Sequence, residues 1–320
     1  MLTHIALLAA GLLLILMGAN YLVDGASSTA RRFGLSEFVI GLTIVGIGTS
    51  APEMVVSFLS AFQGKADMAI GNVVGSNIFN TMLILGVTAI VSPLLITESN
   101  LKKDIPLNIA VTMLLILLGM NGSIFGRGEN VLSRPDGALL IAVFAWYMWS
   151  SFRNDSPSGS GEDSGEVKEY ALPVSLLMIA GGLAALIFGG RMFVNAATEL
   201  ARGFGISDKF IAVTVMAAGT SMPELATCVV AALKGKGQLA LGNILGSNIS
   251  NILLILGGSS LIHPISFSGM TAVDLGAVLL PAAFILLSAY TFRKGKLDRT
   301  EGCILVLMEA AYMWYLISNL

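Results

Sequence analysis

Charge, histidine and cysteine are all scarce in this sequence. Only 12% of the residues are charged, whereas a soluble domain carries about a quarter. The formal net charge of -2 provides no basic surface of the kind that binds nucleic acid. The two cysteines, Cys228 and Cys303, lie in apolar stretches, which predicts buried thiols rather than a disulfide framework. These shortages exclude a soluble enzyme, with its catalytic site and cofactor, and a nucleic-acid-binding protein.

Long apolar stretches make up most of what remains. Hydrophobic residues account for 55% of the chain, and the mean hydropathy is +0.83. A helix that crosses a bilayer core needs ~20 mostly apolar residues. The sequence therefore predicts an all-α integral membrane protein with ten transmembrane helices. The predicted spans are 4–23, 38–62, 68–91, 105–121, 135–152, 171–193, 207–233, 238–262, 271–291 and 301–318.

One polar stretch interrupts this pattern. Residues 153–170 are rich in Ser, Gly, Asp and Glu, which is typical of a solvated linker. Lys and Arg are more numerous in the loops on the linker's side of the membrane, among them Lys102, Lys103 and Arg293. Because basic loops remain in the cytoplasm, we expect a cytoplasmic linker and two extracellular termini. The expected location is the cell (plasma or inner) membrane; the sequence leaves the oligomeric state open.

Two segments of the sequence occur twice. GTSAPEM at 48–54 returns as GTSMPEL at 219–225, and GNVVGSNIFN at 71–80 returns as GNILGSNISN at 242–251. Both pairs share the same offset of 171 residues. A matching register over this length indicates a duplicated unit.

The duplicated units are a first repeat over 1–152 and a second over 171–320, each with five predicted spans. Because five is odd, the second copy enters the membrane from the opposite side. The sequence thus predicts two inverted five-helix repeats related by a pseudo-two-fold axis in the membrane plane. Secondary transporters have this architecture, with substrate sites near the midplane. Alternating access uses the symmetry, since each half can act as the inner or the outer gate.

The second predicted span contains residues that interrupt an apolar helix. Pro52 lacks the backbone donor that would hold the Gly48 carbonyl, and a carbonyl freed in the membrane must face protein or a cavity. Glu53 follows, and an ionisable residue within a span is a functional candidate by default. The candidate cation ligands in the motif at 46–80 are Gly46, Thr49, Ser50, Glu53, Ser76 and Asn80, and those in the motif at 217–251 are Ala217, Thr220, Ser221, Glu224, Ser247 and Asn251.

All of these candidate ligands are oxygen donors. The sequence has no cluster of His or Cys, which disfavours zinc and copper sites. Ca2+ accepts about 6–8 oxygens in flexible geometry, whereas Mg2+ demands a tight octahedron. The mixture therefore fits Ca2+, and the same hydroxyls and carbonyls suit Na+. Two carboxylates balance one Ca2+, whereas three Na+ would leave a surplus positive charge and make exchange voltage-sensitive.

Several polar residues have structural interpretations. The candidate serines could join helices by hydrogen bonds instead of binding a cation, and Asn72 and Asn243 could either support the site or pack. Glu309 lies within a span but its repeat counterpart is Ala138, so we interpret it as a helix-packing or assembly residue. Asp24, at the end of a span, is expected to be solvated. The glycines predicted to be close-packing positions are Gly71, Gly75, Gly242 and Gly246.

The paired GTS-x-PE and GN-x-x-GSN-I-x-N segments resemble the alpha-repeats of the sodium/calcium exchanger family, within the cation/calcium exchanger superfamily. The likeness extends over the whole ten-span plan. It implies exchange of several Na+ for one Ca2+ across a membrane, with these ions and the lipid bilayer as partners and no cofactor. One copy of GTS-x-PE would be a weak signal, but two copies, each followed by its GSN segment at a matching distance, are specific.

The resemblance also implies roles for individual residues. Glu53 and Glu224 would bind Ca2+ and Na+ in competition, with Asn80 and Asn251 in the middle of the site. The flanking sodium sites would then receive carbonyls and hydroxyls from Thr49 and Thr220, carbonyls from Gly46 and Ala217, and hydroxyls from Ser50, Ser76, Ser221 and Ser247.

The sequence departs from the family pattern at Asn251, where several microbial and potassium-dependent relatives have an aspartate. The resulting site has two carboxylates instead of three, which favours exchange without K+. A Ca2+/H+ antiporter, in which the glutamates carry protons, is the nearest alternative. A cation channel is disfavoured because two buried carboxylates forming an occluded site would slow conduction. The linker is also too short for the large regulatory domain of animal members.

Overall fold

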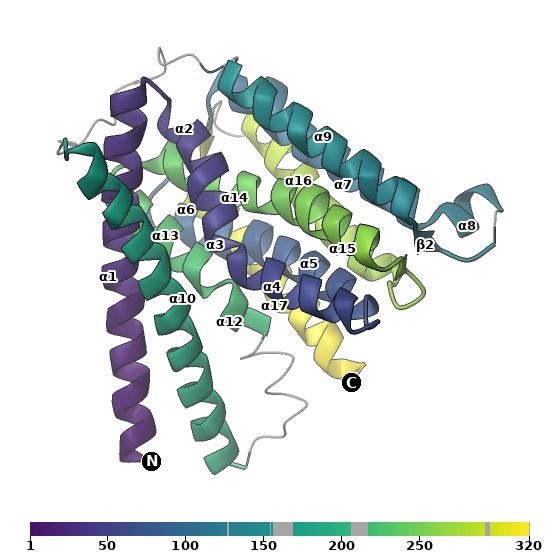
Figure 1. Cartoon of the computed structure of the whole chain (residues 1–320), viewed down its shortest axis with the longest axis horizontal. Coiled ribbons are helices and arrows are strands. Elements are labelled where there is room, and N and C mark those ends of the chain that lie inside the picture. The colour runs from purple at the N-terminus through teal and green to yellow at the C-terminus, as the bar shows by residue number, and fades with distance from the viewer. Residues whose placement is uncertain (127, 154, 156–168, 206–216, 292–294, 320) are drawn as a thin grey trace.

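The computed structural model describes residues 1–126, 128–153, 155, 169–205, 217–291 and 295–319. Most of these residues are helical (Figure 1). Four β-strands of two residues each also occur, and the predominantly helical structure agrees with the predicted all-α class. The predicted linker at 153–170 and the predicted span at 207–233 lie partly outside the described residues.

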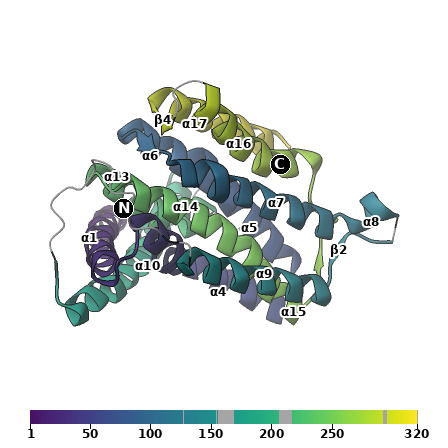
Figure 2. The same cartoon turned by 90° about the horizontal axis from the view of Figure 1, so that it is seen from above.

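Two helices of 32 residues each pack along one another at one end of the molecule. They are α1 (Leu2–Phe33) and α10 (Leu172–Gly203), and both figures show them side by side (Figures 1 and 2). A side chain at Gly18 would lie 2.8 Å from the Gly182 carbonyl oxygen, so glycine permits the close approach. Only 22% and 28% of the most apolar window of these helices is buried. Their outer faces therefore present a long apolar surface that suits lipid.

Two further helical runs form the interior. The first is α5 (Asp67–Phe79), the π-helical segment η2 (Asn80–Ile84) and α6 (Leu85–Val91). The second runs from α14 (Gly237–Ser250) through the π-helical segment η5 (Asn251–Leu256) to α15 (Gly257–Ile262). Asn80 and Asn251 thus begin the two π segments, a geometry that often marks functional positions. Figure 2 shows α14 near the centre of the molecule.

A broken helix precedes each interior run. The first begins with α2 (Glu37–Ile40), η1 (Gly41–Val45) and α3 (Gly46–Thr49), and it breaks at Ser50 before α4 (Ala51–Phe62), with a bend of 48°. In the second, α12 (Ala217–Thr220) breaks at Ser221 before α13 (Met222–Leu233). Proline occupies the second position of both α4 and α13. Since proline suits a first helical turn but not a helix interior, both helices restart there.

The remaining helices surround this interior. In chain order they are η3 (Asn100–Asp104), α7 (Ile105–Gly119), α8 (Asn121–Phe125), α9 (Arg134–Arg153), α16 (Ala272–Thr291) and α17 (Arg299–Ser318).

Two short antiparallel ladders connect the two halves of the chain. Strand β1 (Leu94–Leu95) pairs with β4 (Lys296–Leu297), and β2 (Val131–Leu132) pairs with β3 (Ile265–Ser266). Each ladder joins a loop of the first half to a loop of the second. The paired strands satisfy backbone N–H and C=O groups in the loops between helices.

Every predicted span coincides with helix where the structure describes it, but the helix lengths differ from the predictions. The prediction 4–23 falls ten residues short of the end of α1, because the polar residues after Val23 continue the helix. Among the described residues, five helices are long and apolar enough to cross a membrane, or six if the bent pair Glu37–Thr49 and Ala51–Phe62 is one span. The count of ten crossings stays a prediction.

Two other predictions were wrong. Cys228 is buried as expected, but Cys303 is exposed, since it lies on the outer face of α17. Asp24 is not simply solvated, because its Oδ1 lies 2.7 Å from the Lys234 Nζ, and this ion pair connects α1 to the end of α13.

Candidate ion-binding site

Glu53 and Glu224 occupy equivalent places at the two helix breaks. Each lies in the first turn of the helix that restarts after a serine, Glu53 in α4 and Glu224 in α13. The first turn of a helix has free N–H groups and a positive dipole end, which stabilise a carboxylate. Both glutamates are only 1% exposed. Two acidic side chains are thus buried at positions where the backbone itself favours negative charge.

Hydrogen bonds between the halves bring the two glutamates together. The Ser50 Oγ donates to the Glu224 Oε1 at 3.0 Å, and the Ser221 Oγ donates to the Glu53 Oε1 at 3.2 Å. The serine at each break therefore holds the glutamate of the other half. Ser76 on α5 adds a third hydroxyl, 3.4 Å from the Glu53 Oε1. These contacts assemble four of the predicted residues from both halves, with Ser76, into one cluster.

Four buried oxygens in this region have no hydrogen-bond partner among the described residues. They are the Oε2 atoms of Glu53 and Glu224 and the Oδ1 atoms of Asn80 and Asn251. All four residues are at most 1% exposed. An unpaired buried polar atom costs about 1–3 kcal/mol, so four at repeat-related positions require an explanation. Carboxylate and amide oxygens without partners are suitable ligands for a hard cation.

A second group of contacts surrounds Gly46. Its carbonyl oxygen accepts from the Ser247 Oγ at 3.2 Å and from the Thr49 Oγ1 at 3.4 Å. The Thr49 hydroxyl also lies 3.1 Å from the Asn243 Oδ1. A side chain at residue 46 would lie 3.1 Å from the Ser247 nitrogen, so the helices approach closely there. In the second half Thr220 is half-buried and Ala217 begins α12.

The structure reveals supporting residues that the sequence interpretation did not single out. Asn77 and Asn248 are 2% exposed and hydrogen-bond to Asn251 and Asn80 across the halves. Their signal was present, because each is the asparagine of a GSN triplet. The two undecided asparagines both have structural contacts: the Asn72 Nδ2 donates to the Ser57 Oγ, and the Asn243 Nδ2 donates to the Cys228 Sγ at 3.2 Å.

Glu309 lies on α17 and is 5% exposed. Its Oε2 has no hydrogen-bond partner among the described residues, and its interpretation as a helix-packing or assembly residue stays a prediction. Its neighbour one turn on, Tyr312, donates to the Asp274 Oδ1 at 2.8 Å.

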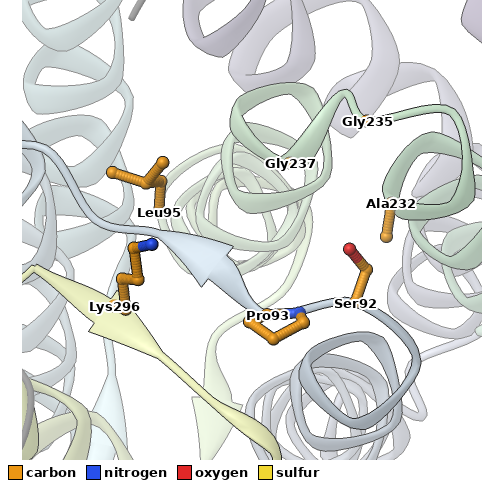
Figure 3. Close-up of a pocket in the computed structure, with 7 residues that line it drawn as sticks. All are labelled: Ser92, Pro93, Leu95, Ala232, Gly235, Gly237 and Lys296. Carbon is orange, nitrogen blue, oxygen red and sulfur yellow. The ribbon is translucent and has the colours of Figure 1, made fainter. Parts of the chain in front are cut away.

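Among the described residues, no group of three or more His, Cys, Asp or Glu side chains could hold a metal ion. A cavity of about 180 Å³ opens beside the β1–β4 ladder, lined by residues that include Ser92 and Lys296 (Figure 3). None of the predicted ligands lines this cavity.

Comparison with known proteins identifies the family. The family model described as sodium/calcium exchanger protein matches residues 3–153 and again 174–318. The chain is 37% identical over 321 residues to the putative antiporter CaxA of Alkalimonas amylolytica, with 97% of each chain covered. It is 35% identical over 338 residues to the sodium/calcium exchanger MaX1 of Methanosarcina acetivorans, with 96% of each covered.

The fold agrees with a solved exchanger. A structure of the sodium-calcium exchanger NCX_Mj, soaked with 10 mM Na+ and 10 mM Sr2+, matches with a TM-score of 0.80 and 30% identity over 95% of each chain. These relatives are transporters and not enzymes. The apolar helices, the buried oxygen cluster and the matches over both halves lead to one conclusion: this chain is an integral membrane protein that belongs to the sodium/calcium exchanger family.

Proposed function

We propose that this chain exchanges Na+ for Ca2+ across the cell membrane by alternating access. One observation carries the proposal: four buried oxygens, from Glu53, Glu224, Asn80 and Asn251, have no partner among the described residues. The relatives named as sodium/calcium exchangers support the choice of ions. A cation bound by these oxygens would remove the cost of leaving them unpaired.

The charge of the site supports calcium and sodium as alternative occupants. Two carboxylates neutralise one Ca2+, and the Glu53 and Glu224 Oε1 atoms are already held by hydroxyls. Further ligands in this proposal are the Gly46, Thr49, Thr220 and Ala217 carbonyls with the serine hydroxyls. Several Na+ in the same site would exceed the two negative charges, so the exchange carries net charge.

Several features support ten spans arranged as two inverted repeats, over 1–152 and 171–320. The paired long helices α1 and α10 and the paired broken helices occupy equivalent places in the two halves. The glutamate–serine bonds run reciprocally between halves, and the family model matches each half separately. In this proposal 153–170 is the cytoplasmic linker and both termini are extracellular.

Independence from K+ is the final part of the proposal. Asn251 provides an amide at a position where an acid would add a third negative charge. With two carboxylates, the site lacks the extra charge that would balance a co-transported K+ beside Ca2+.

Flux into vesicles containing the purified protein tests the proposal. We expect uptake of 45Ca driven by an outward Na+ gradient with K+ absent from both sides. The rate should change when valinomycin and low K+ concentrations clamp the membrane potential. Uptake driven by a proton gradient alone would instead establish a Ca2+/H+ antiporter. Uptake with neither a Na+ gradient nor a proton gradient would indicate a channel. A strict requirement for K+ would contradict the K+-independent form.

A further inference from the structure

A chain of amide hydrogen bonds fixes the orientation of Asn251. The Asn77 Nδ2 donates to the main-chain oxygen of Asn248 at 3.1 Å. A main-chain oxygen can only accept, so this contact determines which end of the Asn77 amide faces Asn248. The Asn77 Oδ1 is left to accept from the Asn251 Nδ2, at 3.0 Å. Asn251 must therefore present its nitrogen to Asn77, and its Oδ1 is the atom without a partner among the described residues.

A second chain of bonds orients Asn80 in the same way. The Asn80 Nδ2 donates to the Asn248 Oδ1 at 3.2 Å, and the Asn248 Nδ2 donates to the Thr81 Oγ1 at 2.8 Å. The Asn80 Oδ1 remains unpaired within the described part of the chain. This second chain ends at a hydroxyl, which can donate or accept. Its direction is thus fixed less firmly than that of the chain ending at the Asn248 carbonyl.

The two oriented amides lie beside the glutamate cluster. Ser76 and Asn80 are four residues apart, so they share one face of the run from α5 to η2. The Ser76 Oγ contacts the Glu53 Oε1, and Asn80 lies one helical turn from Ser76. Ser247 and Asn251 have the same spacing, and the Ser247 Oγ contacts the Gly46 carbonyl. Each amide thus belongs to a face that already touches the site.

We infer that Asn77 and Asn248 are positioning residues of the cation site, which hold the side-chain oxygens of Asn251 and Asn80 toward the bound ion. Neither positioning residue contacts the ion. Each accepts a hydrogen bond from the Nδ2 of its partner, so the amide nitrogen is held on this side and the partner's oxygen is left for the ion. The inference rests on the proposed function, because it assigns the unpaired oxygens to a cation.

The same chain of bonds explains why residue 251 is an amide. A carboxylate at 251 would turn one of its oxygens against the Asn77 Oδ1, and both atoms are acceptors. Asn77 could relieve this contact only by reversing its amide, and its oxygen would then face the Asn248 carbonyl. The bonding partners of Asn77 therefore require a hydrogen-bond donor at 251, which an ionised carboxylate is not.

A double-mutant cycle distinguishes positioning from mere structural support. The variants are Asn77→Leu, which keeps the shape of the side chain without its hydrogen bonds, Asn251→Ala, and the two combined. We expect Asn77→Leu to weaken Ca2+ binding about tenfold in calorimetry and to raise the Ca2+ KM of flux similarly, because Asn251 can then reverse. In the Asn251→Ala background the same substitution should cost nothing further. Equal losses in both backgrounds would overturn the inference.

The second chain of bonds provides a milder version of the same test. Thr81→Val removes the acceptor for Asn248, and its effect on Ca2+ affinity should disappear in the Asn80→Ala background. Persistence of the effect there would contradict positioning of Asn80. This pair keeps the test decisive if Asn77→Leu does not fold. The control is Thr88→Val, which removes a buried hydroxyl bonded to the Ile84 carbonyl of its own helix and should leave the affinity unchanged.

Binding and flux separate this inference from the proposed function. The cycles are read by titrating the purified protein with CaCl2, and in separate experiments with NaCl, whether or not exchange occurs. If the wild type binds Ca2+ and the cycles show the expected coupling, but the wild type does not exchange Ca2+ for Na+, the proposed function alone would be contradicted. Normal exchange with additive effects would contradict the positioning alone. A wild type that binds neither cation would contradict both.

Discussion

The two copies of the GN-x-x-GSN helix have nearly the same sequence but different surroundings. In the window that spans α14 and its continuation, 94% of residues are buried, against 72% for α5 and its continuation. Side chains at Gly242 and Gly246 would collide with the main chain at Phe38 and Leu42. At Gly71 and Gly75 a side chain would meet no atom of the described residues within 4 Å, and both glycines are exposed.

The repeated sequence accounts for the features that the two halves share, but not for the contacts that differ between them. The proposed ligands are symmetric at the glutamates, since each glutamate is held by the serine of the other half. The described packing differs, since α14 lies tightly against the first broken helix, whereas the segment of the second half equivalent to 38–42, residues 209–213, lies outside the described residues.

Removal of either glutamate charge tests the symmetric part and should have the largest effect. Glu53→Gln and Glu224→Gln keep the side-chain shape but leave the cation with one balancing charge in a poorly solvated site. An uncompensated charge there costs several kcal/mol, which predicts a loss of Ca2+ affinity of about 100-fold or more in each variant. Calorimetry and 45Ca flux on the purified, folded variants measure this. Near-normal transport by either variant would show that the glutamates do not form one site.

Matched alanine substitutions on α14 and α5 test whether these two helices are packed differently. Gly246→Ala places a methyl group against the Leu42 main chain, and overpacking of this kind costs about 1–3 kcal/mol. Gly75→Ala meets no atom of the described residues within 4 Å and gains helix propensity, up to ~1 kcal/mol. We therefore expect Gly246→Ala to lower the melting temperature in detergent and Gly75→Ala to leave it unchanged or raise it. Equal shifts in both variants would remove the distinction between the two helices.

The sequence could single out the repeated residues of the candidate site, but not the contacts that differ between the halves. Glu53 with Glu224, and Asn80 with Asn251, could be chosen because each occurs twice in one register. The close packing predicted at the four glycines is confirmed for Gly242 and Gly246. For Gly71 and Gly75 it stays a prediction, because the equivalent segment 209–213 lies outside the described residues. The reciprocal serine–glutamate bonds and the β ladders depend on how the halves meet, which no pattern within one half encodes.

A smaller effect is expected where the halves differ in one atom. Asn72 donates to the Ser57 hydroxyl, whereas the equivalent Asn243 donates to the Cys228 sulfur. Cys228→Ser makes the second half like the first and retains an acceptor for Asn243. Since the exchanged acceptors differ little in size, we expect the KM for Ca2+ to change by no more than about twofold. A tenfold change would show that the thiol has a role of its own.

The smallest effect is expected at Glu309. This residue is buried on α17, and the equivalent position in the first half is Ala138. Glu309→Gln should transport at nearly the wild-type rate, because the residue has no counterpart in the symmetric site. A transport-dead but folded Glu309→Gln protein would place an essential acid outside the four-oxygen cluster.

Anomalous diffraction from crystals soaked in Sr2+ tests the central claim most directly, since Sr2+ takes the same hard oxygen ligands as Ca2+. The account predicts one strong peak bounded by the Oε2 atoms of Glu53 and Glu224 and the Oδ1 atoms of Asn80 and Asn251, weakened when Na+ is raised. It predicts no such peak in crystals of Glu53→Gln. A dominant peak elsewhere, for example in the cavity beside Lys296, or a peak that persists in Glu53→Gln, would contradict it.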